Sequence, residues 1–300
     1  MTRTALTYEA AGVSLSVADA VVERLRAAVE STGASGFGAF AGLYPLDGRR
    51  LLAASTDSVG TKLVLARARG RLRACGADLA AHCINDVLTT GAEPLFLLDY
   101  VAASRIDAEQ VAELVEGAAE LCRAAGVVLV GGETAELPDV YREGELDFAG
   151  TCVGIVDADG LVDGSRVEAG DAVVGFQSAG VHANGFTLVR RALEREDYDG
   201  DDLLAPTRVY LEEVRSLRGE ARALAHVTGG GIAGNLARVL PPGLAAEIDW
   251  ESWERPPVFE WLGRHVAEDE LRRVFNLGIG FCAVVHDPGE RLVIGRIVRK

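Results

Sequence analysis

Four times along the chain, a short apolar stretch runs into a glycine-rich polar loop. The loops span residues 56–62, 131–136, 178–185 and 228–235, and each carries polar or charged side chains among its glycines. Loops at strand ends are where α/β proteins place their ligands, because glycine lets backbone N–H groups approach phosphate oxygens closely. The recurring pattern therefore predicts an α/β protein that binds its ligands at several strand ends.

Strand and helix patterns alternate in both halves of the chain. A glycine- and acid-rich stretch at 157–170 separates the halves, so we expect two mixed α/β domains, residues 1–160 and 161–300. Ser16 is expected to cap the first helix. The expected strands are 51–55, 95–103, 127–130, 148–156, 172–176, 224–227, 244–249, 277–285 and 292–298, and the expected helices are 17–30, 63–69, 76–90, 107–125, 186–195, 208–218 and 256–275.

Charge and cysteine content exclude several classes of protein. The 30 basic and 45 acidic residues give a net charge of −15, which repels nucleic acids and anionic membranes at long range. The sequence lacks both an apolar run long enough to span a membrane and the apolar core of a signal peptide at its N-terminus. Its five cysteines are widely spaced without a CxxC pair, as in proteins with reduced thiols. We therefore expect a cytoplasmic protein whose ligand is a small molecule, not a nucleic acid or a membrane.

Three carboxylates interrupt otherwise apolar stretches. Asp57 is expected just past a strand, Asp86 follows Asn85 near the end of a helix, and Glu133 lies in the loop after another strand. Carboxylates on loops beside glycines suit Mg²⁺, which proteins hold through one or two carboxylates together with substrate phosphates. Most other acidic residues of so acidic a chain are expected to be solvated, so these three are the metal candidates.

Lys62 is unusual because the chain otherwise uses arginine as its basic residue. Of the 30 basic residues, only Lys62 and the last residue, Lys300, are lysines. Lys62 ends the loop Asp-Ser-Val-Gly-Thr-Lys, where a point charge beside a glycine is placed to contact a phosphate. The alternative is a surface lysine without a ligand. The loop is not a Walker A motif, because GxxxxGK[ST] is absent.

Two histidines border glycine loops. His182 lies in Gly-Val-His-Ala-Asn-Gly and His226 in His-Val-Thr-Gly-Gly-Gly. Either residue can serve as a general acid or base or as a phosphate ligand, and a packed or capping histidine is the structural alternative. His82 shares a helix face with Asp78 and Asp86 at four-residue spacing, but it lacks a glycine loop, and for it we favour a structural role.

The segment Gly-Gly-Gly-Ile-Ala-Gly (229–234) fits the GxGxxG pattern of dinucleotide-binding proteins. It follows a short expected strand and precedes a helix, and Asp249 lies twenty residues after Gly229. Only 66 residues follow Gly234, however, and two prolines at 241–242 interrupt the crossover that such a fold needs. We therefore do not favour a dinucleotide-binding fold.

Taken in order, the loops and their flanks closely resemble the phosphoribosylformylglycinamidine cyclo-ligases, a family also called the aminoimidazole ribonucleotide synthetases. The resemblance covers nearly all of residues 8–285. The Asp-x-Val-Gly-Thr-Lys, Gly-Gly-Glu-Thr-Ala-Glu and His-x-Thr-Gly-Gly-Gly loops together are highly specific for it. The segments that carry the resemblance are 8–13, 36–38, 56–62, 83–86, 91–100, 131–136, 178–185, 203–208, 226–231 and 275–280.

The resemblance implies a cytoplasmic enzyme of purine biosynthesis with two α/β domains of the α+β type, whose N-terminal sheets pair in a homodimer. The implied reaction is the ATP-dependent cyclisation of formylglycinamidine ribonucleotide, a phosphoribosyl substrate, to 5-aminoimidazole ribonucleotide. ATP with Mg²⁺ would turn the formyl amide oxygen into an iminophosphate. The amidine nitrogen would then close the ring, and ADP and phosphate would be released. K⁺ is a candidate for an additional monovalent ion.

The resemblance also implies roles for individual residues. Catalysis would depend on Asp57, Lys62 and His182, with His182 in proton transfer. The nucleotide and its metal would be held by Gly36, Gly38, Asp57, Thr61, Lys62, Asn85, Asp86 and Glu133, of which the metal ligands would be Asp57, Asp86 and Glu133. The substrate would be held by His182, Asn184, His226, Thr228, Gly229, Gly230 and Gly231.

Two features depart from the family pattern. The N-terminal glycine loop is shorter than usual and carries no lysine, which leaves Arg26 as the nearest basic side chain. The helix that family members have between the last two strands, here 277–285 and 292–298, is missing. We therefore expect one face of the second sheet to be uncovered or packed differently, with a cost to the stability of the second domain.

Two alternatives remain open. The first is another ATP-dependent member of the superfamily, of the selenophosphate synthetase or thiamine-phosphate kinase type. The reactive cysteine or selenocysteine usual in selenophosphate synthetases is absent from residues 31–42. The second is a non-catalytic paralogue that acts as a binding subunit, suggested by the missing helix. ATP binding that depends on Mg²⁺ would separate an enzyme from a scaffold.

Overall fold

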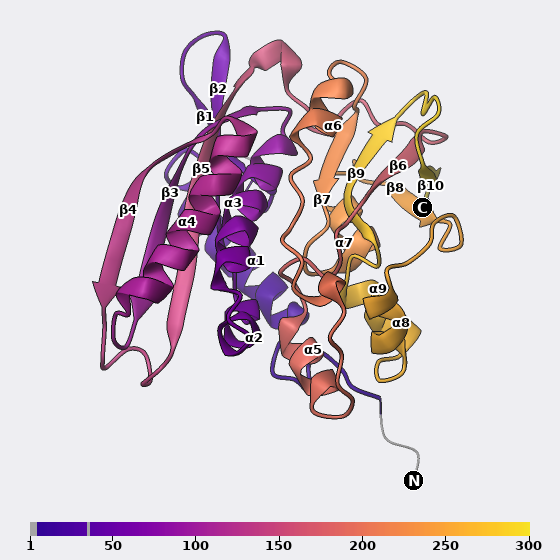
Figure 1. Ribbon diagram of the computed structural model, residues 1–300. Helices are drawn as coiled ribbons and strands as arrows, with labels where there is room; N and C mark the ends of the chain where they lie inside the picture. Colours follow the sequence, from indigo (N-terminus) through magenta and orange to yellow (C-terminus); the bar gives the residue numbers. More distant parts are fainter. Residues whose placement is uncertain (1–4, 35–36) are drawn as a thin grey trace.

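The computed structural model describes residues 5–34 and 37–300, and these form two five-stranded sheets that lie side by side (Figure 1). The first sheet contains β1 to β5 and the second contains β6 to β10. The predicted mixed α/β fold is confirmed. The boundary expected at residue 160 falls between β5 (Leu146–Asp157) and β6 (Ala172–Gln177), just after a 3₁₀ turn at Ala158–Gly160.

The first sheet has the strand order β1-β2-β5-β3-β4. Its neighbouring strands are antiparallel except for β3 and β4, which run parallel because α4 (Ala108–Ala125) connects them. α3 (Leu72–Leu88) and α4 pack against the sheet on the same side. The other strands and the remaining helices of this half are β1 (Gly42–Pro45), β2 (Arg50–Ser58), β3 (Glu93–Ala103), β4 (Val128–Glu136), α1 (Leu15–Glu30) and α2 (Lys62–Ala68).

Two glycines let α3 and α4 pack closely. A Cβ atom at Gly76 would lie 2.0 Å from the carbonyl oxygen of Leu114. A Cβ atom at Gly117 would lie 2.0 Å from the carbonyl oxygen of Arg73. No larger residue fits at either position without separating the helices, so this contact fixes where α3 lies on the sheet.

The second sheet has the order β7-β9-β6-β10-β8, and each neighbouring pair runs antiparallel. β7, which leads into the triglycine loop (229–231), therefore pairs with no parallel strand, in agreement with our preference against a dinucleotide-binding fold. The remaining elements of this half are α5 (Phe186–Leu193), a 3₁₀ turn (Asp201–Leu203), α6 (Leu211–Ser216), β7 (Ala223–His226), α7 (Gly231–Ala237), β8 (Leu244–Ile248), α8 (Pro257–Gly263), α9 (Glu268–Val274), β9 (Ile279–Val285) and β10 (Val293–Arg299).

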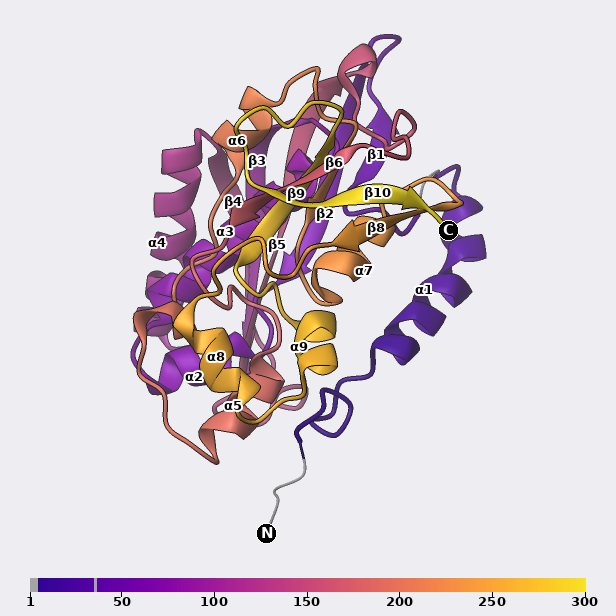
Figure 2. The ribbon, with the colours of Figure 1, turned by 90° about the vertical axis from the view of Figure 1, so that its right-hand side faces the viewer.

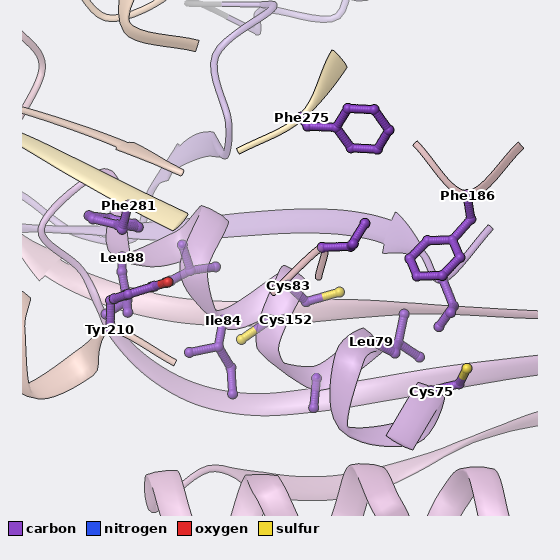
Figure 3. Close-up of a cluster of buried hydrophobic side chains, with 14 of the residues drawn as sticks. Cys75, Leu79, Cys83, Ile84, Leu88, Cys152, Phe186, Tyr210, Phe275 and Phe281 are labelled. Carbon is purple, nitrogen blue, oxygen red and sulfur yellow. The ribbon is translucent and has the colours of Figure 1, made fainter. Parts of the chain in front are cut away.

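One hydrophobic cluster joins the two domains around α3. Leu79 and Leu88 of α3 are fully buried with aromatic side chains of the second domain, including Phe186, Tyr210 and Phe281 (Figure 3). Burying each side chain of this size contributes about 1.5–3 kcal/mol. The helix is thus part of the core of both domains.

The structure corrects several expected boundaries. β2 continues to Ser58, so Asp57 lies within the strand and not after it. β4 continues to Glu136, so residues 131–136 form a strand and not a loop. β2 stays paired with β5, and β4 stays paired with β3, although the sequence at the ends of β2 and β4 is polar or glycine-rich. Ser14, not Ser16, caps α1 by accepting a hydrogen bond from the N–H of Val17.

The second sheet is covered although β10 follows β9 without a helix between them. α7 and the apolar residues after it, such as Leu240 and Trp253, pack on the face formed by Val173, Cys282 and Ile294. Among the described residues of the second domain, the only large apolar side chain found exposed is Val293. Of the two expected outcomes, an uncovered face is therefore not found, and a packing different from that of the family stays a prediction. Within the described residues no helix has the length and apolar character needed to cross a membrane.

Candidate active site

Two histidine–aspartate pairs lie side by side between the domains. His82 Nδ1 lies 3.2 Å from Asp57 Oδ2, and His226 Nδ1 lies 2.8 Å from Asp86 Oδ1. The two imidazole rings are 5.0 Å apart, centre to centre, at an angle of 78°. Asp57 comes from β2, His82 and Asp86 from α3, and His226 from the end of β7, so these pairs bring three elements of both domains to one place.

Pairing sets the charge states of these groups. Burial alone would raise the pKa of Asp57 and lower the pKa of His82. The hydrogen bond and the opposite charges within the pair outweigh burial, so the pKa of Asp57 is lowered and the pKa of His82 is raised. At His226, burial outweighs the carboxylate of Asp86, and the pKa is lowered. The Asp57–His82 pair therefore has more ionic character than the Asp86–His226 pair. In the second pair, His226 is a neutral imidazole near pH 7.

His182 is buried in an unusual backbone conformation. Its φ is +65°, and a Cβ atom at Gly280 would lie 2.5 Å from its Cε1 atom. Its Nε2 atom accepts a hydrogen bond from the N–H of Ala179 at 3.3 Å, which leaves the ring proton on Nδ1. Burial lowers its pKa well below the usual value, and repulsion from the protonated forms of His82 and His226 adds to this effect. His182 is therefore a neutral imidazole whose Nδ1–H is a donor.

Buried nitrogen atoms without a hydrogen-bond partner occur on the residues around these pairs. Among the described residues they include Nε2 of His82, Nε2 of His226, Nδ1 of His182 and Nδ2 of Asn184. Buried polar atoms are normally paired in folded proteins. Unpaired donors and acceptors on neighbouring residues are typical of a site that binds a polar ligand.

Lys62 forms a buried ion pair. Its Nζ atom lies 2.7 Å from Asp78 Oδ2 and donates to the carbonyl oxygen of Ala205 at 3.0 Å, and both charged side chains are fully buried. The other oxygen of Asp78 accepts the N–H and O–H of Thr207, both at 2.8 Å. The pair therefore ties α2 and α3 to the second domain. Phosphate binding by Lys62 stays a prediction, and in this structure its ammonium group is committed to Asp78.

Asn85 and Thr61 also contact the second domain. Asn85 Nδ2 donates to the carbonyl oxygen of Arg208 at 2.8 Å, and its Oδ1 accepts the N–H of Tyr210 at 3.1 Å. Thr61 Oγ1 lies 3.0 Å from Oγ1 of Thr187 on α5, and Thr61 remains exposed. Asn85 thus orders the 208–210 segment, whereas Thr61 remains accessible to a ligand.

Glu133 lies on the opposite face of the first sheet from Asp57. Asp57, Gly150, Asp99 and Gly132 are direct partners across β2, β5, β3 and β4, so they share one face. Glu133 follows Gly132, and successive side chains in a strand alternate between faces, so its exposed side chain lies on the other face. A single chain therefore does not bring the three predicted metal carboxylates together.

Asp57 and Asp86 have the chemical properties of Mg²⁺ ligands. Both are carboxylates beside unpaired buried nitrogen atoms, and each is hydrogen-bonded to a histidine, as metal-binding carboxylates usually are. No group of three or more His, Cys, Asp or Glu that could hold a metal occurs within residues 5–34 and 37–300. A metal held by these two residues therefore needs further ligands, such as phosphate oxygens.

The glycines of the triglycine loop (229–231) and of α7 differ in how strictly the backbone requires them. Gly230 and Gly231 have φ values of +105° and +65°, and a Cβ atom at Gly231 would lie 1.9 Å from the carbonyl oxygen of Arg272. Gly234 has ordinary helical backbone, and a Cβ atom there would meet nothing within 4 Å. The close contact between this loop and α9 therefore requires glycine at position 231.

We expect Gly231→Ala to destabilise the protein by about 2 kcal/mol or more, because the methyl group collides with backbone and the residue must keep a positive φ. Chemical denaturation of purified variants measures the effect. Gly234→Ala is the matched control in the same segment and should leave stability unchanged or raise it by up to about 1 kcal/mol. Equal stability of the two variants would contradict the steric role of Gly231.

A cavity of about 1200 Å³ lies between the first domain and the triglycine loop. Its walls come from α1, the segment 37–44 and α7, and α1 lies at the edge of the molecule (Figure 2). The lining is largely apolar, with Gly38 and the side chains of Phe37, Arg26, Arg238 and Arg273. A space of this size and character accepts a nucleotide. Gly36, predicted to be in the nucleotide loop, lies outside the described residues.

Comparison with known proteins identifies the family. Residues 38–156 match the family described as AIR synthase related protein, N-terminal domain, and residues 168–293 match its C-terminal domain. The chain belongs to the AIR synthase-related family. Phosphoribosylformylglycinamidine cyclo-ligase from Synechococcus sp. (strain CC9605) is 46% identical, with 96% of this chain and 90% of that protein covered. The protein of the same name from Nitrosococcus oceani is 45% identical, with 98% and 92% covered.

Solved structures share the fold of this AIR synthase-related chain. AaThiL complexed with AMPPCP and TMP has a TM-score of 0.67 at 16% identity, with 92% of this chain and 90% of that chain covered. T. maritima PurL complexed with ADP has a TM-score of 0.59 at 20% identity, with 89% and 43% covered. E. coli HypE has a TM-score of 0.63 at 21% identity, with 83% and 80% covered. At these identities the likeness concerns the fold alone.

Sequence analysis missed some residues of the candidate site. His82 is expected to be structural, yet it pairs with Asp57, and the available signal is its four-residue spacing from Asp78 and Asp86. The same spacing is the only signal for Asp78 as the partner of Lys62. Nothing in the sequence points to Arg238, whose contacts with the first domain appear only in the folded structure.

Proposed function

We propose that this chain is an ATP-dependent cyclo-ligase. It converts formylglycinamidine ribonucleotide to 5-aminoimidazole ribonucleotide, with release of ADP and phosphate, in cytoplasmic purine biosynthesis. The observation that carries the proposal is 45–47% identity to proteins named phosphoribosylformylglycinamidine cyclo-ligase over 93–98% of this chain. Asp57, Asp86, His182 and His226, which the family resemblance singles out, lie in or beside one polar site between the domains.

The proposed reaction has two steps. The formyl amide oxygen attacks the γ-phosphorus of ATP, an O–P bond forms, and ADP leaves. The amidine nitrogen then attacks the activated carbon, the C–N bond forms, the C–O bond breaks, and phosphate leaves while the nitrogen loses a proton. Charge builds on phosphate oxygens in the first step, so positioned cations and N–H donors contribute most there.

Asp57 and Asp86 are the proposed metal ligands within one chain. Bound Mg²⁺ supplies positive charge that offsets the repulsion between the triphosphate and a chain of net charge −15. His82 and His226 hold the two carboxylates through their Nδ1 atoms. Thr61 and the glycine loops would donate to phosphate oxygens, and K⁺ is the monovalent ion to test.

The geometry favours His226 over His182 as the proton acceptor. His226 directs Nδ1 to Asp86, which leaves the lone pair on Nε2, a buried atom with no partner. His182 instead presents Nδ1–H as a donor, because its Nε2 accepts from the backbone. In the proposed reaction His226 takes the proton from the amidine nitrogen, and His182 donates a hydrogen bond to substrate.

A second copy of the chain is the proposed partner of the first sheet. Leu98, Tyr100 and Val128 leave 36–59% of their surface exposed on the face opposite α3 and α4. An apolar sheet face of this kind is typical of an interface between copies. Glu133, paired in register with Tyr100, lies on the same face and would point towards the partner copy.

Leu98→Glu is expected to convert a dimer of about twice 31.7 kDa into a 31.7 kDa monomer, because it places a charge in the proposed interface. Light scattering after size exclusion measures the mass. Val64→Glu is the control, since Val64 is 53% exposed on α2, away from this face. A Leu98→Glu protein that keeps the wild-type dimer mass would contradict pairing through this face.

The test of the proposed function is ATP hydrolysis by the purified protein with and without formylglycinamidine ribonucleotide, with aminoimidazole formation scored in the same sample. We expect ADP and aminoimidazole in equal amounts and only when both substrates are present. Mg²⁺-dependent ATP binding without cyclisation would indicate another activity of the superfamily. No Mg²⁺-dependent binding of ATP at all would indicate a non-catalytic subunit.

A further inference from the structure

Arg238, at the end of α7, contacts residues 38–40, which belong to the described part (37–42) of the N-terminal glycine loop. One of its terminal nitrogens, Nη2, lies 3.3 Å from the carbonyl oxygen of Gly38 and 3.2 Å from that of Ala39. Its guanidinium carbon lies 3.8 Å from the centre of the Phe40 ring. The loop is therefore held at three successive residues by one side chain of the second domain.

The other terminal nitrogen connects Arg238 to the triglycine loop. Nη1 lies 3.4 Å from Oδ1 of Asn235. Asn235 is buried, and its Nδ2 donates to the carbonyl oxygen of Gly231 at 2.8 Å and lies 3.4 Å from that of Gly229. A chain of contacts thus runs from the N-terminal glycine loop through Arg238 and Asn235 to the triglycine loop.

Phe40 shows that this contact is part of the packing of the second domain. Only 7% of its surface is exposed, and it belongs to the hydrophobic cluster of α7 and the second sheet, with Ile232 and Leu236. The segment 37–44 and α7 both line the 1200 Å³ cavity, which Arg238 itself lines. Arg238 therefore joins two segments that line the same cavity.

We propose that Arg238 is a positioning residue that latches the N-terminal glycine loop to the triglycine loop and so holds the nucleotide cavity in its binding shape. The inference rests on the proposed function in assigning ATP to this cavity. Arginine suits the role because its planar guanidinium donates in two directions and stacks on an aromatic ring at the same time. Lysine offers a point charge and retains only part of these contacts.

The first measurement is limited digestion with chymotrypsin in the absence of nucleotide, with cleavage after Phe37 and Phe40 read by mass spectrometry. Arg238→Ala should be cut at these two positions about tenfold faster than wild type, because the loop loses its anchor. Arg296→Ala is the matched control, since Arg296 forms an exposed ion pair with Glu247 on β8, and it should be cut at the wild-type rate.

The second measurement is the dissociation constant for ATP with Mg²⁺, by calorimetry on folded protein. Arg238→Ala should weaken binding about tenfold, Arg238→Lys by less, and Arg296→Ala not at all. The KM for ATP should rise by the same factor, with a smaller effect on kcat. A residue that only stabilises the fold would lower the unfolding temperature and leave the affinity of the folded protein unchanged.

The outcomes separate this inference from the proposed function. Wild-type cleavage at Phe37 and Phe40 in Arg238→Ala overturns the latch, whatever the enzyme does with ATP. Faster cleavage with unchanged ATP affinity overturns the link to the nucleotide cavity. If the wild-type protein binds no ATP, the proposed function fails, and the digestion still decides whether Arg238 anchors the loop.

Discussion

Asp57→Asn is expected to lower kcat by about 10²–10³-fold or more while leaving the fold intact, because the variant loses a negative charge of the proposed metal and triphosphate site. Asp57 accepts the N–H of Ser58 through Oδ1 and contacts His82 through Oδ2, so the single amide oxygen of asparagine keeps only one of these contacts. The fold should still persist, because the side chain keeps its size and residue 57 stays paired with Gly150 across the sheet. Steady-state kinetics give kcat, and the thermal shift produced by ATP with Mg²⁺ gives a readout that does not depend on turnover.

Asp99→Asn is the matched control for this prediction. Asp99 lies in the same row of the first sheet as Asp57, with Gly150 of β5 between them, and it takes no part in the histidine–aspartate pairs. Its pKa is raised by burial, so removing the charge is not expected to harm the fold. The Asp99 variant should keep its activity within about threefold. Near-normal activity of Asp57→Asn would remove Asp57 from the metal site.

Lys62→Met is expected to lower the free energy of unfolding by about 3–5 kcal/mol, because it leaves the carboxylate of Asp78 buried without its counter-charge. Both side chains are fully buried, and Asp78 also holds the backbone of Thr207. Chemical denaturation measures the loss. The double variant Lys62→Met/Asp78→Asn should be more stable than the single one, because asparagine keeps an acceptor for Thr207 and carries no charge.

The same variants test the phosphate role that the sequence predicts for Lys62. If its ammonium group leaves Asp78 and binds ATP, Lys62→Met should weaken ATP binding strongly with little loss of stability, and the double variant should not recover. If Lys62 instead stays paired with Asp78 when ATP binds, Lys62→Met should lower the free energy of unfolding. The folded double variant should then bind ATP like the wild type. A stable single variant would contradict the assignment of the pair as an interdomain contact.

Much of the fold could be predicted because periodicity is a local property. The apolar spacing of α4 and the apolar run of β3 place these elements to within about three residues of their ends. The ends of β2 and β4 could not be placed in the same way. Their polar and glycine-rich ends resemble loops, and they remain strands because neighbouring strands pair with them along their whole length.

The candidate site could be predicted in its residues but not in its partners. Four-residue spacing correctly puts Asp78, His82 and Asp86 on one face of α3. Their partners are Lys62, Asp57 and His226, which come from different elements up to 140 residues away in sequence. No local pattern encodes such pairs. The scarcity of lysine did indicate a local reason for Lys62, and the structure supplies a buried carboxylate.

The position of α3 bears on how such a protein can be divided or recombined. The helix belongs to the first half of the chain, yet Asp78, Asn85 and Asp86 are all bonded to residues between 207 and 226. Moving the helix by one residue would turn it by about 100° and withdraw all three side chains together. A chimera can join the first half of one relative to the second half of another. In such a chimera, the residues of α3 must match both the first sheet and the 207–226 segment. Otherwise the contact between the domains and the candidate active site are lost together.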